Sequence, residues 1–142
     1  MNQHGEGNMN ARTTILLVDD DSRFRFALAT ELRASGYLVQ SAEDGQRATG
    51  MIEDGGEPWA DIDLVITDLV MPRKDGLELC KTIRKKNMDI PVLVITGFLS
   101  PNIQRELERL GCTDFLEKPF SPQEFLSKVE LMLLHRAADS RQ

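Results

Sequence analysis

The sequence predicts a single doubly wound α/β domain in which five parallel strands alternate with five helices. Three observations support this fold class. Short apolar runs alternate along the chain with longer segments whose apolar residues recur at helical spacing. Three of the runs are apolar at successive positions, as expected for strands that helices cover on both faces. Glycine and proline residues separate many of these segments and indicate turns.

Length and composition limit the class of protein. A chain of 142 residues has room for one domain with a substantial core. The hydrophobic fraction is 41% and the charged fraction is 28%, and no apolar run could cross a bilayer, so we expect no membrane association. The net charge of −6 disfavours direct nucleic-acid binding, because contacts to phosphates need clustered Lys and Arg. We expect a flexible leader over 1–12, the domain over 13–135 and a polar tail over 136–142.

The two cysteines, Cys80 and Cys112, are far apart in the sequence and have no metal-binding spacing. Neither a zinc site nor a disulfide framework is indicated. We therefore expect reduced, inert thiols in a cytoplasmic protein.

The first half of the chain contains two strand and helix pairs. An apolar strand over 14–18 ends in three successive acids, of which Asp21 is expected to cap the next helix. That helix begins at Ser22 and ends before Gly36. Its helical spacing is set by Phe24, Ala27, Leu28 and Leu32. The remaining elements expected here are an outer strand over 37–42, a helix over 46–53 and a loop over 54–58.

The second half contains three more pairs. Its first strand begins at Leu64, carries Asp68 near its end and is closed by Pro72 and Gly76. Ser121, followed by Pro122 and Glu124, is typical of a helix start. The expected elements after the strand are a helix over 77–86 with a basic end, a strand over 91–96, a helix over 101–110, a strand over 113–117 and a helix from Ser121 through Leu133.

Polar side chains follow four of these strands. Because the carboxyl ends of parallel strands meet at one edge of a sheet, we expect Asp19, Asp20, Asp68, Thr96 and Lys118 to lie close together. Asp68 alone could simply cap the following turn. Three neighbouring carboxylates repel one another unless a cation neutralises them, and an all-oxygen ligand set favours Mg²⁺. Asp20 and Asp68 are the expected direct ligands.

The same edge of the sheet could hold a phosphoryl group. Lys118 offers a positive charge and Thr96 a hydroxyl, which are donors that phosphoryl oxygens need. A carboxylate can act as the nucleophile and form an aspartyl phosphate. Asp68, in the centre of the predicted sheet, is the candidate for that role.

Together these motifs resemble the receiver domain of the response regulator family, the phospho-acceptor half of two-component signalling. The resemblance covers 13–134, nearly the whole chain. It implies a flavodoxin-like (βα)5 domain. The matching positions are the acid pair Asp19-Asp20, the phosphorylated Asp68, the turn Met71-Pro72-Arg73-Lys74-Asp75-Gly76, the switch hydroxyl Thr96 followed by Gly97, the aromatic switch residue Phe115 and the pair Lys118-Pro119.

The resemblance also implies details of the site. Mg²⁺ is expected to bind Asp20, Asp68 and the backbone carbonyl of Val70, and to reach Asp19 through water. A cis peptide bond is expected before Pro119. The switch position occupied by Phe115 is often tyrosine in the family, so an output that needs a hydroxyl there is not expected.

The implied function is a phosphorylation-dependent signalling switch. A sensor histidine kinase or a phosphotransfer protein would donate the phosphoryl group to Asp68, and Thr96 and Phe115 would then change the surface formed by 101–110, 113–117 and the last helix. We expect no enzyme activity beyond self-phosphorylation and self-dephosphorylation. The downstream target, an output domain and a phosphorylation-dependent homodimer are left open by the sequence.

Two alternatives from other classes remain. A phosphatase that forms an aspartyl phosphate with Mg²⁺ would place its nucleophile after the first strand in a DxDx pattern, whereas Asp19, Asp20 and Asp21 are contiguous. Turnover of a generic phosphate ester would favour it. A receiver-like scaffold that works without phosphorylation would not need a costly cluster of acids.

Overall fold

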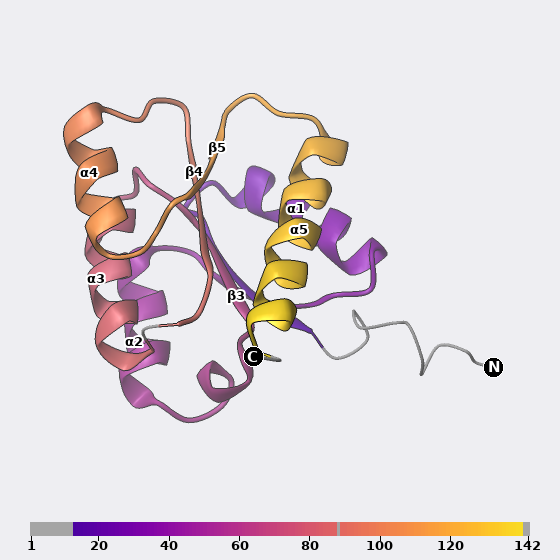
Figure 1. Cartoon of the computed structure of the whole chain (residues 1–142), viewed down its shortest axis with the longest axis horizontal. Coiled ribbons are helices and arrows are strands. Elements are labelled where there is room, and N and C mark those ends of the chain that lie inside the picture. Colours follow the sequence, from indigo (N-terminus) through magenta and orange to yellow (C-terminus); the bar gives the residue numbers. More distant parts are fainter. Residues whose placement is uncertain (1–12, 88, 141–142) are drawn as a thin grey trace.

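Strands and helices alternate along the chain in the computed structural model, which describes residues 13–87 and 89–140 (Figure 1). The predicted leader over 1–12 lies outside the described residues. The elements are β1 (Thr14–Val18), α1 (Ser22–Ala34), β2 (Leu38–Ala42), α2 (Gly45–Asp54), the 3₁₀ helix η2 (Trp59–Asp61), β3 (Leu64–Asp68), α3 (Gly76–Lys86), β4 (Val92–Thr96), α4 (Pro101–Arg109), β5 (Asp114–Glu117) and α5 (Pro122–Ser140).

The five strands form one parallel sheet in the order β2-β1-β3-β4-β5. This is the flavodoxin-like order of a doubly wound sheet, so the predicted fold class is confirmed. Figure 1 shows α2, α3 and α4 on one side of the sheet and α1 and α5 on the other. All five strands run in the same direction, and the loops that follow them therefore share one edge.

Each face of the sheet has its own apolar core, because successive strand residues point to opposite faces. Leu16 and Val18 of β1 face α2, α3 and α4, whereas Ile15 and Leu17 face α1 and α5. These strand residues are almost completely buried. Nowhere in 13–87 or 89–140 is there a helix with the length and apolar character needed to span a membrane.

The helix starts follow the capping chemistry expected from the sequence. The carboxylate of Asp21 accepts hydrogen bonds from the backbone N–H groups of Arg23 at 3.0 Å and Phe24 at 3.2 Å, so Asp21 caps α1. At α5, Ser121 and Glu124 form a capping box, in which each side chain accepts a bond from the other residue's backbone N–H.

Two sequence predictions need correction. On α1 the buried alanine is Ala29, which lies three residues before Leu32 and shares its face, whereas Ala27 is exposed. Between α2 and β3, η2 follows the predicted loop, and its Trp59 is buried in the core. The last helix continues to Ser140, so 136–140 is helical instead of forming a tail.

The extension of α5 is anchored to the strand layer. The guanidinium of Arg136 donates hydrogen bonds to the backbone carbonyl and the carboxylate of Asp63, which directly precedes β3. The carboxylate of Asp63 also accepts a bond from the backbone N–H of Thr14 at 2.9 Å. These contacts connect the end of α5 to the starts of β1 and β3.

Candidate functional site

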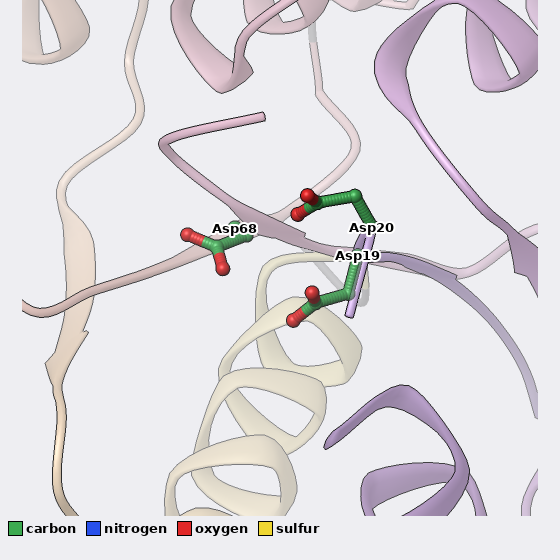
Figure 2. A group of neighbouring side chains, drawn as sticks. All are labelled: Asp19, Asp20 and Asp68. Carbon is green, nitrogen blue, oxygen red and sulfur yellow. The ribbon is translucent and has the colours of Figure 1, made fainter. Parts of the chain in front are cut away.

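The register of the sheet places two strand ends side by side. Val18 pairs with Thr67, so Asp19 and Asp20, which follow β1, lie next to Asp68 at the end of β3. One carboxylate oxygen from each of the three acids lies within 4.8 Å of those of the other two (Figure 2). Asp19 is 1% exposed and Asp68 is 7% exposed, whereas Asp20 is exposed to solvent. The structure thus brings together the acids that the sequence singles out.

Lys118 lies directly against Asp68. Its ammonium Nζ donates a hydrogen bond of 2.8 Å to Oδ2 of Asp68. The other carboxylate oxygen, Oδ1, accepts a bond of 3.3 Å from the backbone N–H of Val70. The pairing of β5 with β4 positions Lys118, because its backbone N–H donates to the carbonyl of Thr96 at 2.9 Å. The peptide bond from Lys118 to Pro119 is cis.

Asp19 is less well compensated than Asp68. Its Oδ1 accepts a bond of 2.9 Å from the backbone N–H of Asp21. Burial raises the pKa of the Asp19 carboxyl to about 6, a rise that the nearby charges of Asp68 and Asp20 reinforce and that the Asp21 bond and the Lys118 charge only partly oppose. The carboxylate of Asp19 is therefore costly to keep ionised in this buried position beside two other acids.

The turn after β3 is fitted closely around the site. A Cβ atom on Gly76 would lie 2.5 Å from the backbone oxygen of Asp68, so only glycine fits there without a shift of the backbone. The backbone N–H of Gly76 donates to the carbonyl of Leu69 at 2.8 Å. Asp75 then caps α3 by accepting a bond from the N–H of Glu78. Pro72 and Gly76, predicted as turn residues, both lie in this turn.

A third buried acid, Asp44, supports the same turn. Asp44 caps α2, and its carboxylate accepts bonds from the backbone N–H of Arg47 at 2.8 Å and from Nε of Arg73 at 2.9 Å. These hydrogen bonds, with the backbone bond the larger, lower the pKa of Asp44. Arg73 adopts a left-handed backbone conformation with φ 68°. Asp44 therefore connects the start of α2 to the turn beside Asp68.

Of the predicted switch residues, Thr96 lies at the same edge as Asp68 and Phe115 lies further back on β5, and neither makes a hydrogen bond to Asp68 among the described residues. The hydroxyl of Thr96 is buried, donates to the carbonyl of Phe98 at 2.9 Å and accepts from its N–H at 3.2 Å. Phe115 is half-buried and packs against the core beneath α4. Thr96 is held by the backbone of the following loop.

An apolar rim borders the acids. Val70 and Phe98 are each 73% exposed, although both are large and hydrophobic. Together with Leu77 and Ile103 they line an open groove of about 340 Å³ between the turn after β3 and the start of α4. The site is therefore charged at its centre and apolar on the side of α4.

A comparison with known families matches residues 15–130 to the response regulator receiver domain. The chain is a member of that family. The family predicted from the sequence is thus confirmed.

Relatives of this receiver domain agree with the assignment. The response regulator MprA of Mycobacterium sp. (strain KMS) is 36% identical over 125 residues, which cover 88% of this chain and 52% of MprA. The MprA of Mycobacterium bovis (strain BCG / Pasteur 1173P2) is 37% identical over 119 residues, which cover 84% of this chain and 50% of that protein. The receiver domain thus spans about half the length of the curated relatives it matches.

Solved structures also resemble the receiver domain. The chemotaxis protein CheY4 of Vibrio cholerae has a TM-score of 0.74 at 30% identity and covers 84% of this chain and 98% of its own. A response regulator receiver protein from Pseudomonas putida has the same TM-score and identity, with 84% of this chain and 97% of its own covered.

The sequence did not reveal two contacts beside the acids, the pairing of Asp44 with Arg73 and the packing of Phe24 against Lys118. Asp44 precedes a helix, and a capping pattern could have found it, but nothing in the sequence indicated its pairing with Arg73. The ring of Phe24 lies under the ammonium of Lys118, with 4.5 Å between Nζ and the ring centroid. This contact joins residues 94 positions apart, and only the packing of α1 beside the loop after β5 brings them together.

Proposed function

We propose that this receiver domain accepts a phosphoryl group on Asp68 from a phosphohistidine of a partner histidine kinase or phosphotransfer protein. The observation that carries the proposal is the bond of 2.8 Å between Lys118 and a carboxylate that lies within 4.8 Å of two further acids. This is a nucleophile beside a cation, at the edge where a parallel sheet binds ligands. The domain is both the substrate and the catalyst of the transfer.

The acids fit Mg²⁺ as the metal of the site. The cluster offers oxygen ligands, which a hard cation prefers. The raised pKa of Asp19, which burial and then the charges of Asp68 and Asp20 cause, supports the same assignment, since a cation would stabilise the ionised carboxylate. Asp20, Asp68 and the backbone carbonyl of Val70 are the proposed direct ligands, and Asp19 is the ligand through water. When bound, Mg²⁺ supplies positive charge that offsets the charge on the carboxylates and phosphoryl oxygens.

Asp68 and Lys118 have different roles in the transfer, since Asp68 is the nucleophile and Lys118 stabilises negative charge. A carboxylate oxygen of Asp68 forms the new O–P bond as the P–N bond to the donor imidazole breaks, and the imidazole keeps the electron pair of that bond and takes up a proton. The ammonium of Lys118, already bonded to Asp68, holds negative charge on the phosphoryl oxygens. The burial of Asp68 limits the water that could compete with the donor.

Phosphorylation changes the hydrogen bonding of Thr96. The phosphoryl group adds about −1.5 to −2 charge and new acceptor oxygens. The Thr96 hydroxyl then exchanges its bonds to the backbone of Phe98 for a bond to a phosphoryl oxygen, and Phe115 moves toward the space it leaves. The surface of α4, β5 and α5 changes with them and regulates a protein partner or an output domain.

Asp68→Asn tests the proposal. Asparagine keeps the shape of the side chain but is a far weaker nucleophile, so labelling by acetyl phosphate with Mg²⁺ should be lost. Intact-protein mass spectrometry measures the added phosphoryl group, and sensitivity to hydroxylamine identifies it as an acyl phosphate. Asp89→Asn is the matched control, because Asp89 is an exposed aspartate in the loop before β4, at the opposite edge of the sheet, and should label as the unmodified protein does.

Equal labelling of the Asp68→Asn variant would contradict the assignment of Asp68. A correctly folded unmodified protein that takes no label would favour the scaffold that works without phosphorylation.

A further inference from the structure

The ammonium of Lys118 lies between a carboxylate and an aromatic ring. Nζ is 2.8 Å from Oδ2 of Asp68 and 4.5 Å from the centroid of the Phe24 ring. A cation within about 6 Å of a ring centroid is attracted by the negative face of the ring. Phe24 belongs to the first turn of α1, which directly follows the acids of β1.

The Phe24 ring is itself held in place. It packs edge-on against Phe120, with 5.9 Å between ring centroids, and Phe120 stacks on Phe125 at 5.8 Å. Phe125 is fully buried between α5 and the sheet. The backbone N–H of Phe24 is fixed by its bond to the Asp21 cap. A row of three rings therefore connects the site to the core.

Lys118 needs such support. Its side chain is 32% exposed and has a flexible four-carbon stem, so many rotamers directed into solvent compete with the one that reaches Asp68. A ring face attracts the ammonium without accepting a conventional hydrogen bond, and it tolerates small sideways shifts of the charge. The N–H donors of Lys118 thus remain available for the oxygens of Asp68 and of an incoming phosphoryl group.

We propose that Phe24 is a positioning residue for phosphoryl transfer, and that the face of its ring holds the Lys118 ammonium at Asp68. This inference rests on the proposed function of Asp68. The positioning of Lys118 is assigned to the aromatic face of Phe24. It does not depend on the apolar volume of the side chain, because leucine would also supply that volume.

Substitution at position 24 gives the first test. Phe24→Leu keeps an apolar side chain but lacks the ring, so the rate of labelling by acetyl phosphate with Mg²⁺ should fall about two- to fivefold, as expected for loss of a partly exposed cation–π contact. Phe24→Tyr keeps the ring face and should retain most of the rate. Phe26→Leu is the matched control, because Phe26 is a phenylalanine of the same helix that is 71% exposed, and its rate should not change.

Fluorinated phenylalanines at position 24 give the decisive test. Each added fluorine weakens the negative face of the ring while the size of the side chain changes little, so the logarithm of the labelling rate should fall stepwise with fluorine number. The same series at position 26 should be flat. The melting temperature of each protein, measured in parallel, separates a loss of folding from a loss of positioning.

The outcomes distinguish this inference from the function on which it rests. An unmodified protein that labels, together with a flat fluorine series at position 24, would overturn the role of Phe24 and leave Asp68 as the acceptor. An unmodified protein that takes no label would overturn both.

Discussion

The carboxyl edge of the sheet is where its parallel strands end, and the amino edge is where they begin. At the carboxyl edge, Asp19 and Asp68 are buried beside Asp20, and of these three acids only Asp68 has an ion-pair partner among the described residues. At the amino edge, the buried guanidinium of Arg84 is surrounded by hydrogen-bond acceptors. The guanidinium of Arg84 donates to the backbone carbonyls of Leu110 at 2.6 Å, Ile90 at 2.7 Å and Asn87 at 3.2 Å. Those carbonyls belong to the loops that precede β4 and β5.

Arg84 also contacts a cysteine thiol at the amino edge. Nη2 of Arg84 lies 3.7 Å from Sγ of Cys112, which the fold brings to Cys80 of α3. A hydrogen bond from Cys80 and the charge of Arg84 lower the pKa of Cys112, against the opposing effect of burial. At the amino edge, backbone carbonyls of the protein itself compensate the buried charge of Arg84. At the carboxyl edge, the three acids leave negative charge that a bound ligand would compensate. The comparison indicates that stability depends on the amino edge and function on the carboxyl edge.

Replacing Arg84 should produce the largest change in stability. Arg84→Leu leaves three carbonyls without their donor, and we expect a loss of about 3 kcal/mol in the free energy of unfolding, because each buried group without a partner costs about 1–3 kcal/mol and some regain water. Urea unfolding followed by circular dichroism measures the loss. The rate of labelling by acetyl phosphate, measured in the absence of urea, should stay close to that of the unmodified protein.

Lys85→Leu is the control for Arg84, since Lys85 is the next residue of the same basic run and is exposed. Equal stability of the Arg84→Leu and Lys85→Leu variants would contradict the role of the amino edge in stability. A large loss of labelling rate in folded Arg84→Leu would contradict the assignment of function to the carboxyl edge alone.

Asp19→Asn should change stability in the opposite direction. The folded pKa of about 6 lies above the ordinary aspartate value of 3.8, so the carboxyl favours the folded state when protonated, and that contribution is lost as the pH rises through about 6. At pH 7 without a divalent cation, asparagine should therefore raise the free energy of unfolding by about 1–3 kcal/mol, since one pKa unit corresponds to about 1.4 kcal/mol.

The pH profile sharpens this prediction. The gain from Asp19→Asn should shrink as the pH falls from about 6 and vanish below about 3.8, where the carboxyl is protonated in both states. Urea unfolding in a chelator at several pH values measures it. Added Mg²⁺ should reverse the order, because it stabilises the unmodified protein more than the variant. A gain that does not depend on pH would point to a cause other than the carboxylate charge.

The sequence predicted the carboxyl edge better than the amino edge, for a physical reason. Parallel strands bring their following residues to one edge, so the order of elements alone places Asp19, Asp68 and Lys118 together. Arg84 looked like part of an exposed basic helix end, because the run over 84–86 suits a helix dipole. Its burial depends on where two distant loops pass, and a local pattern carries no information about that.

The same limit applies to contacts between loops and helices. The ring of Phe24 beneath Lys118 and the pairing of Asp44 with Arg73 depend on how α1 and α2 pack beside loops far away in the sequence. The buried stripe of α1 shows a smaller form of this limit, since the exact rotation of the helix decides between Ala27 and Ala29. Spacing predicted the helix but did not fix the face that it buries.

Asp44 is a third buried aspartate close to the carboxyl edge, and its substitution should have the smallest effect of those considered. Its pKa is lowered by the hydrogen bonds of Arg47 and Arg73, so its carboxylate contributes stability that is present above the unfolded pKa and is lost as the pH falls through the lower folded pKa. Asp44→Asn keeps a helix cap but removes the charge, and it should lower the free energy of unfolding at pH 7 by about 0.5–1 kcal/mol, since the Arg73 side chain is mostly exposed.

Urea unfolding in a chelator compares Asp44→Asn with Glu43→Gln, whose carboxylate is exposed and should matter little. Asp19 and Asp44 are 1% and 4% exposed, so burial alone would give their asparagine variants the same sign. Opposite signs are expected because the hydrogen bonds from Arg47 and Arg73 outweigh the burial of Asp44, whereas burial and the neighbouring acids both raise the pKa of Asp19. A gain in stability from both substitutions would show that burial, and not the set of neighbouring charges, decides the cost of an acid at this edge.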